Sequence, residues 1–202
     1  MAVVVVGGNS RNIGKTSVVA GLIARLPEMH WTAFKITQHG HQVCDGLSRS
    51  CDCITPDHSV SFHEETNRTS GKDSARFLYA GAVRSVLVRT RKGSLAQAMP
   101  RLRAEFAAAE NVLVESNSVM EYLYPQLYLT VLDPRTTDFK ESVELFLERA
   151  DAVLWSSELV ARRQATWPAG SHKQIEAKPQ FVIGPPDFVT EELIAFVLGR
   201  LA

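Results

Sequence analysis

The sequence contains little cysteine and no excess charge of either sign. Three of its 202 residues are cysteine, an odd number, and the apolar stretch 2–6 is too short for a signal peptide. We therefore expect reduced thiols in a cytoplasmic protein. Lys and Arg together number 22, as do Asp and Glu, so the formal net charge is zero. This neutrality does not favour a nucleic-acid partner, because binding to phosphate backbones depends on positive charge.

Long apolar runs are missing as well. No stretch approaches the roughly 18 apolar residues that a membrane-spanning helix requires, so we expect no membrane association. The 45% apolar and 22% charged content is that of an ordinary globular protein. A length of 202 residues fits one domain, which we place at 1–202.

Short apolar runs alternate with helical patterns from end to end. The valine-rich run 2–7 is unbroken, which is typical of a strand buried on both faces of a parallel sheet. Six more strands are predicted, at 31–37, 85–90, 111–115, 127–132, 152–156 and 181–183, and helices at 15–26, 95–109, 142–149 and around 193–201. This alternation predicts an α/β fold: a doubly wound, mostly parallel sheet in three layers.

The clearest functional motif follows the first strand. The segment 7–17 reads GGNSRNIGKTS and leads directly into an amphipathic helix. Backbone amides of such a loop and the start of the helix bind phosphate oxygens, Lys15 reaches the outer phosphates, and the Thr16 hydroxyl binds Mg²⁺. The common pattern has glycine where this chain has Asn9, a residue that tolerates left-handed backbone angles. The predicted nucleotide contacts in this loop are Gly8, Asn9, Asn12, Ile13, Gly14, Lys15, Thr16 and Ser17.

A second element of the same site is predicted at Glu115, which ends the apolar strand Val112-Leu113-Val114. An acid at the carboxyl end of a strand beside the phosphate loop can hold Mg²⁺ or a water of the ion. We therefore predict Lys15 and Glu115 as the catalytic pair, with Thr16 and Glu115 at the Mg²⁺. The alternative is a plain acid at a strand end.

Four segments resemble the molybdopterin-guanine dinucleotide biosynthesis protein B family, within the P-loop class that includes dethiobiotin synthetase. They are the phosphate loop 8–17, the stretch Phe34-Lys35-Ile36-Thr37, the pair Gly71-Lys72-Asp73-Ser74 and Ala80-Gly81-Ala82, and the strand end Val112-Leu113-Val114-Glu115. The resemblance covers about residues 2–118. It implies a GTP-binding homodimer with weak, Mg²⁺-dependent hydrolysis that assists a partner protein in molybdenum-cofactor biosynthesis. It also places Lys72 and Asp73 near the active edge.

Alternatives remain open at this point. The Asn-Lys-x-Asp motif that recognises guanine is not present in the sequence, so the sequence does not predict whether GTP or ATP is bound. A ligase or kinase of the dethiobiotin synthetase type would use Lys35 to hold a small acid. A third hypothesis is a metal-binding or metal-delivery module in which the nucleotide state controls the conformation of the metal-binding loop.

The metal-binding hypothesis depends on the segment 38–70. This segment lacks hydrophobic periodicity, so we predict a long irregular loop. Residues 39–63 hold all three cysteines and four of the six histidines. Cys44, Cys51 and Cys53 with one histidine would suit Zn²⁺ or an Fe–S cluster. The spacing matches no standard metal motif, so incidental thiols are the alternative, and His39 and His41 can instead serve a substrate.

Elemental analysis separates these alternatives. A thiolate site predicts about one metal ion per chain or per two chains in protein purified without chelator, and its loss in the double variant Cys51→Ser/Cys53→Ser. Metal-free wild-type protein with three freely titrating thiols would make the cluster incidental.

Overall fold

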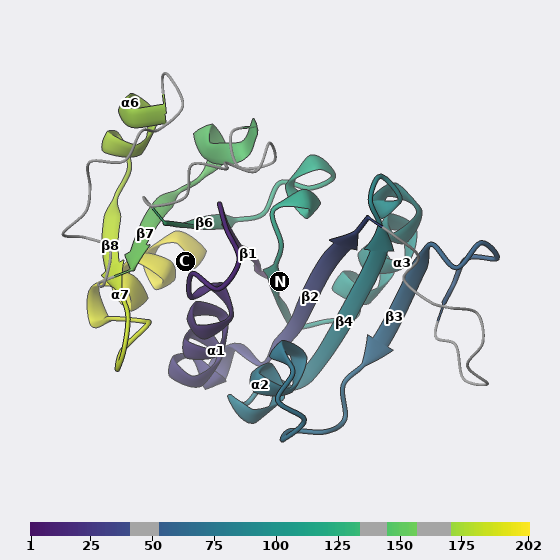
Figure 1. The fold of residues 1–202 in the computed structure, drawn as a ribbon. Coiled ribbons are helices and arrows are strands. Elements are labelled where there is room, and N and C mark those ends of the chain that lie inside the picture. Colours follow the sequence, from purple (N-terminus) through teal and green to yellow (C-terminus); the bar gives the residue numbers. More distant parts are fainter. Residues whose placement is uncertain (41–52, 134–144, 157–170) are drawn as a thin grey trace.

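The computed structural model describes residues 1–40, 53–133, 145–156 and 171–202. They form one eight-stranded sheet with helices on both faces (Figure 1). The strand order is β3-β4-β2-β5-β1-β6-β7-β8, and every neighbouring pair is parallel except β3 with β4. The predicted α/β class with a mostly parallel, doubly wound sheet is confirmed.

The strands are β1 (Val3–Gly8), β2 (Trp31–His39), β3 (Val60–Glu64), β4 (Arg84–Arg91), β5 (Asn111–Glu115), β6 (Leu127–Leu132), β7 (Ala152–Ser156) and β8 (Gln180–Ile183). The α-helices are α1 (Lys15–Arg25), α2 (Asp73–Tyr79), α3 (Leu95–Ala107), α6 (Ser171–Glu176) and α7 (Glu191–Leu201). Short 3-10 helices lie at Pro27–Met29, Ser118–Glu121 and Leu147–Arg149.

The valine run of β1 is buried on both faces, as predicted. Val4 and Val6 pack in the cluster that contains α1 and α7, whereas Val5 packs in the cluster that contains α3. Successive side chains of a strand point to opposite faces, so a central strand needs apolar residues at every position. This explains why the run shows no alternation.

Connections run to both sides of β1, which makes its carboxyl end a switch point of the sheet. From β1 the chain passes through α1 to β2 on one side, and later passes from β5 to β6 on the other side. Ligands of open α/β sheets bind at such a switch point, outside the carboxyl ends of the strands. The fold therefore puts the β1–α1 loop where a ligand is expected.

The predicted irregular segment 38–70 is corrected in part. β2 continues to His39, and Val60–Glu64 forms the antiparallel edge strand β3. Only Val60 and Phe62 of β3 enter the core, so its alternation is too short to be distinguished from a loop. His41, Cys44 and Cys51 lie outside the described residues.

Three helical regions differ from expectation. Of the helix expected at 142–149, residues 145–149 lie in the described part, and Leu147–Arg149 form a 3-10 turn. Helices α2 and α6 were not predicted, because seven and six residues are too few to show a helical period.

In the described part of the chain, no helix is long and apolar enough to cross a bilayer.

Candidate nucleotide-binding site

The loop between β1 and α1 carries the predicted phosphate motif. Gly14 is the N-cap of α1 with φ at +101°, and Asn12 has φ at +58°. Glycine and asparagine are the residues that adopt this left-handed region at least cost. These angles turn the chain so that α1 begins at the switch point, with its free amides at the carboxyl ends of the strands.

Asn117 clamps the start of this loop. Its Oδ1 accepts a hydrogen bond from the amide of Gly8 and its Nδ2 donates to the carbonyl of Gly8, both at 2.7 Å. A side chain on Gly7 would put its Cβ 1.9 Å from this Oδ1, so glycine is required there. Burial raises the pKa of Tyr128 to about 12, so its hydroxyl stays protonated and donates to Asn117 Oδ1 at 3.3 Å.

Asn9 fastens the loop from the other side. It is fully buried; its Nδ2 donates to the carbonyl of Asp133 at 2.9 Å, and its Oδ1 accepts from the amide of Asp133 at 2.8 Å. The amide of Asn9 donates to the carbonyl of Val131 at 3.2 Å. The asparagine that replaces the usual glycine thus holds the loop to the end of β6, and its side chain faces the protein.

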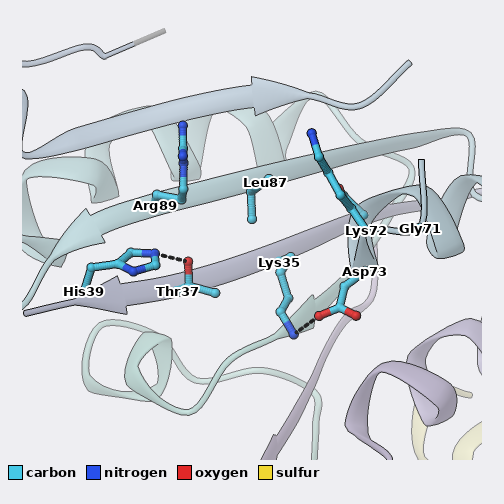
Figure 2. Close-up of a pocket in the computed structure, with 9 residues that line it drawn as sticks. Lys35, Thr37, His39, Gly71, Lys72, Asp73, Leu87 and Arg89 are labelled. Carbon is cyan, nitrogen blue, oxygen red and sulfur yellow. Dashed lines mark hydrogen bonds and ion pairs between the residues drawn. The ribbon is translucent and has the colours of Figure 1, made fainter. Parts of the chain in front are cut away.

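A chain of polar contacts joins the loop to three further elements. Thr16 Oγ1 donates to Glu115 Oε2 at 2.8 Å, and Lys35 Nζ donates to Glu115 Oε1. Lys35 also pairs with Asp73 Oδ2 at 2.9 Å (Figure 2). Glu115 is 3% exposed, so this carboxylate is removed from water and depends on these partners. Residues predicted separately on α1, β2, β5 and α2 are therefore brought together.

The register of the sheet explains this meeting. Glu115 lies opposite Val6 of β1 and opposite Lys35 of β2. Side chains directly opposite on one face of neighbouring strands lie within contact distance. Lys35, which the ligase alternative assigned to a small acid, is therefore bonded to two carboxylates of the protein.

The remaining predicted loop residues have varied surroundings. Lys15 Nζ donates to the carbonyl of Ser10 across the loop, and Ser17 Oγ accepts from Arg76 at 3.0 Å. Ile13 is buried in the core beside α1, and Asn12 is exposed. Ile13 anchors the loop, so any ligand contact from it would come from its backbone.

Thr16 and Glu115 fit a Mg²⁺ ion. Mg²⁺ prefers oxygen ligands, and this hydroxyl–carboxylate pair lies beside the phosphate loop. The described residues do not bring three thiolates together for a soft metal, because Cys53 is the one cysteine among them and it is partly exposed. Within the described ranges, no group of three or more His, Cys, Asp or Glu residues could hold a metal.

The sequence indicates three further contributors to the site only weakly or not at all. Asn117 follows the strand that Glu115 ends and adds a polar group at that edge, which favours the functional interpretation of Glu115, but its pairing with Gly8 has no local signal. Arg89 belongs to a run of charges after an apolar strand, for which an anionic ligand and a solvated surface are both open interpretations, and Arg76 lies on a helix too short to be predicted.

The chain matches no protein-family model, and no curated protein sequence shows significant similarity to it. Solved structures show the fold. HypB from Helicobacter pylori, determined in complex with nickel, is 15% identical over 98% of this chain and 85% of that chain, with a TM-score of 0.51. The hydrogenase maturation factor HypB from Archaeoglobus fulgidus is 13% identical over 100% and 91%, with a TM-score of 0.50.

The chain shares its α/β fold with these two proteins, and identities this low show the fold alone. The motif and the fold agree, because the phosphate loop lies between β1 and α1 at the switch point. The finer resemblance to the molybdopterin-guanine dinucleotide family is not established by these comparisons.

The clamp can be tested with Asn117→Ala. Removal of the side chain leaves the Gly8 amide and carbonyl without partners, which costs about 1–3 kcal/mol per buried group. We expect the free energy of unfolding in urea to fall by that order and nucleotide affinity to fall with it. Gln174→Ala removes an exposed amide side chain on α6, so it is the control and should change neither. Unchanged stability of Asn117→Ala would refute the clamp.

Proposed function

We propose that this protein binds a nucleoside triphosphate with Mg²⁺ and hydrolyses it slowly. The observation that carries the proposal is the contact of 2.8 Å between Thr16 Oγ1 and Glu115 Oε2, made where the phosphate loop enters α1. A strand–loop–helix motif alone is compatible with a structural turn. A buried acid bonded to the hydroxyl that would bind Mg²⁺ is what a nucleotide site needs in addition.

Each residue has a defined task in this proposal. The loop amides and the start of α1 bind phosphate oxygens, and Lys15 binds the outer phosphates. Thr16 and Glu115 would hold the ion, which neutralises charge on the β- and γ-phosphates. Lys35 positions Glu115 through the ion pair between them. Water is the proposed acceptor of the γ-phosphoryl group, and either GTP or ATP is the donor.

The finer role that we propose is that of a homodimeric adaptor in molybdenum-cofactor biosynthesis, which acts with a partner protein. Its support is the family resemblance of the four segments 8–17, 34–37, 71–82 and 112–115. The nucleotide that copurifies with the protein and the mass of the complex in solution test the nucleotide choice and the dimer.

Lys15→Ala should lose most nucleotide affinity and keep the fold. A charge-assisted contact contributes about 1.5–3 kcal/mol, so we expect a loss of roughly 10- to 100-fold in affinity. Calorimetric titration with ATP and with GTP measures it. Lys173→Ala, on α6, removes an exposed lysine and is the control. Wild-type affinity of Lys15→Ala for both nucleotides would refute the phosphate site.

Glu115→Gln should impair Mg²⁺-dependent hydrolysis more than nucleotide binding. The neutral amide keeps the size of the side chain and loses the charge that attracts the ion, whereas the phosphate contacts come from the loop. Hydrolysis rates over a range of Mg²⁺ concentrations should show a higher Mg²⁺ requirement. Glu110→Gln, at an exposed position just before β5, is the control. Wild-type rates at limiting Mg²⁺ would make Glu115 a plain strand-end acid.

A further inference from the structure

A hollow of about 400 Å³ lies on one face of β2 and β4, beside the start of α2. This volume is within the range of about 300–1,000 Å³ usual for small-molecule sites. Figure 2 shows the side chains that surround it. The lining residues are Lys35, Thr37, His39, Gly71, Lys72, Asp73, Ser74, Leu87 and Arg89.

The strands place these side chains on one face. Lys35, Thr37 and His39 alternate along β2, and the register sets Leu87 of β4 opposite Lys35 and Arg89 opposite Thr37. The same face carries Ala33 and α2 farther down the strands, where it is packed. In Figure 2, Arg89 and Lys72 extend in the same direction on either side of Leu87. Two cationic side chains from separate segments thus border one hollow.

Charge on the lining is mainly positive. Lys35, Lys72 and Arg89 are cationic, and Asp73 is the one acidic residue among them. The Asp73 carboxylate pairs with Lys35. Two further acids interact with lining residues: Glu115 accepts from Thr16 and Lys35, and Glu65 accepts from Ser74 and attracts the charge of Lys72. The other polar groups of the lining include the Arg89 guanidinium, the Lys72 ammonium, the Thr37 hydroxyl and the His39 ring.

We propose that this hollow binds the oxyanion group, phosphate or carboxylate, of a second small ligand. A guanidinium presents a planar fork that matches two oxygens of such a group, and an ammonium adds a point charge. The Thr37 hydroxyl, 3.2 Å from His39 Nε2, adds a polar group on the floor. Oxyanion recognition needs this combination of charge and directional hydrogen bonds.

The position links this ligand to the nucleotide. Lys35 borders the hollow and is bonded to Glu115, which is bonded to Thr16 of the phosphate loop. Lys35 therefore connects a ligand in the hollow to Glu115, a residue of the proposed Mg²⁺ site. Its assignment as a second substrate rests on the proposed nucleotide function, whereas the binding of an oxyanion by the hollow does not.

Calorimetry with inorganic phosphate, and separately with malonate, tests the proposal at an ionic strength of about 0.15 M, where distant charges are screened. The phosphate loop must not contribute. Wild-type protein is therefore first saturated with Mg²⁺ and a non-hydrolysable triphosphate analogue, and Lys15→Ala without nucleotide is titrated in parallel. We expect saturable binding of at least one of the two anions in both preparations.

Arg89→Gln and Lys72→Gln should each weaken that binding by about tenfold or more, the usual effect of losing a charge-assisted hydrogen bond. Arg91→Gln is the matched control, because Arg91 lies on the same strand, is exposed, and pairs with Asp57 outside the hollow. It should bind like the wild type. Lys72 is exposed, so its variant remains informative if Arg89→Gln does not fold.

The proposal is overturned by the absence of saturable binding of both anions, or by binding that neither Arg89→Gln nor Lys72→Gln weakens. An equal loss in Arg91→Gln would also overturn it, because it would reveal a general charge effect. Failure of the triphosphate analogue to bind would count against the proposed function alone. The titrations of Lys15→Ala, and of Arg89→Gln made in Lys15→Ala, would then still show whether the hollow binds an oxyanion.

Discussion

The buried carboxylate of Glu115 is the constraint on which the site depends. A carboxylate at 3% exposure is stable only with partners, and here it has the Thr16 hydroxyl on one oxygen and the Lys35 ammonium on the other. These partners come from α1 and β2, so one acid at the end of β5 fixes both neighbouring elements relative to each other. Lys35 extends the connection to Asp73 at the start of α2.

Two asparagines hold the phosphate loop in place before any ligand arrives. Asn117 pairs with both backbone groups of Gly8, and Asn9 pairs with both backbone groups of Asp133. A loop that must present its amides to phosphate cannot satisfy itself internally, so its edges are secured by side chains that donate and accept at once. A preorganised loop loses less conformational freedom on binding, which favours affinity.

The strongly patterned elements were predictable and the weakly patterned ones were not. β1 and α1 stand out because an unbroken valine run and a helical period are both local signals. β3 was missed because two core residues, Val60 and Phe62, are too few to reveal alternation. Thr16 and Glu115 could be assigned to one site because strand ends meet at one edge. The contacts of Asn117 with Gly8, and the approach of Lys72 to Arg89 around one hollow, depend on pairings between distant segments.

The fold class follows from the sequence because strands and helices alternate along the chain, and the phosphate loop and the acid at the end of β5 follow from spacing within short stretches. The tertiary structure shows which of the predicted side chains are bonded to other parts of the protein. The Asn9 side chain is bonded to the end of β6, and Lys35 is bonded to two carboxylates of the protein. Arg89 and Lys72 border the same hollow. The physical reason is strand register: it sets which residues of separate segments lie opposite each other, and no local pattern encodes it.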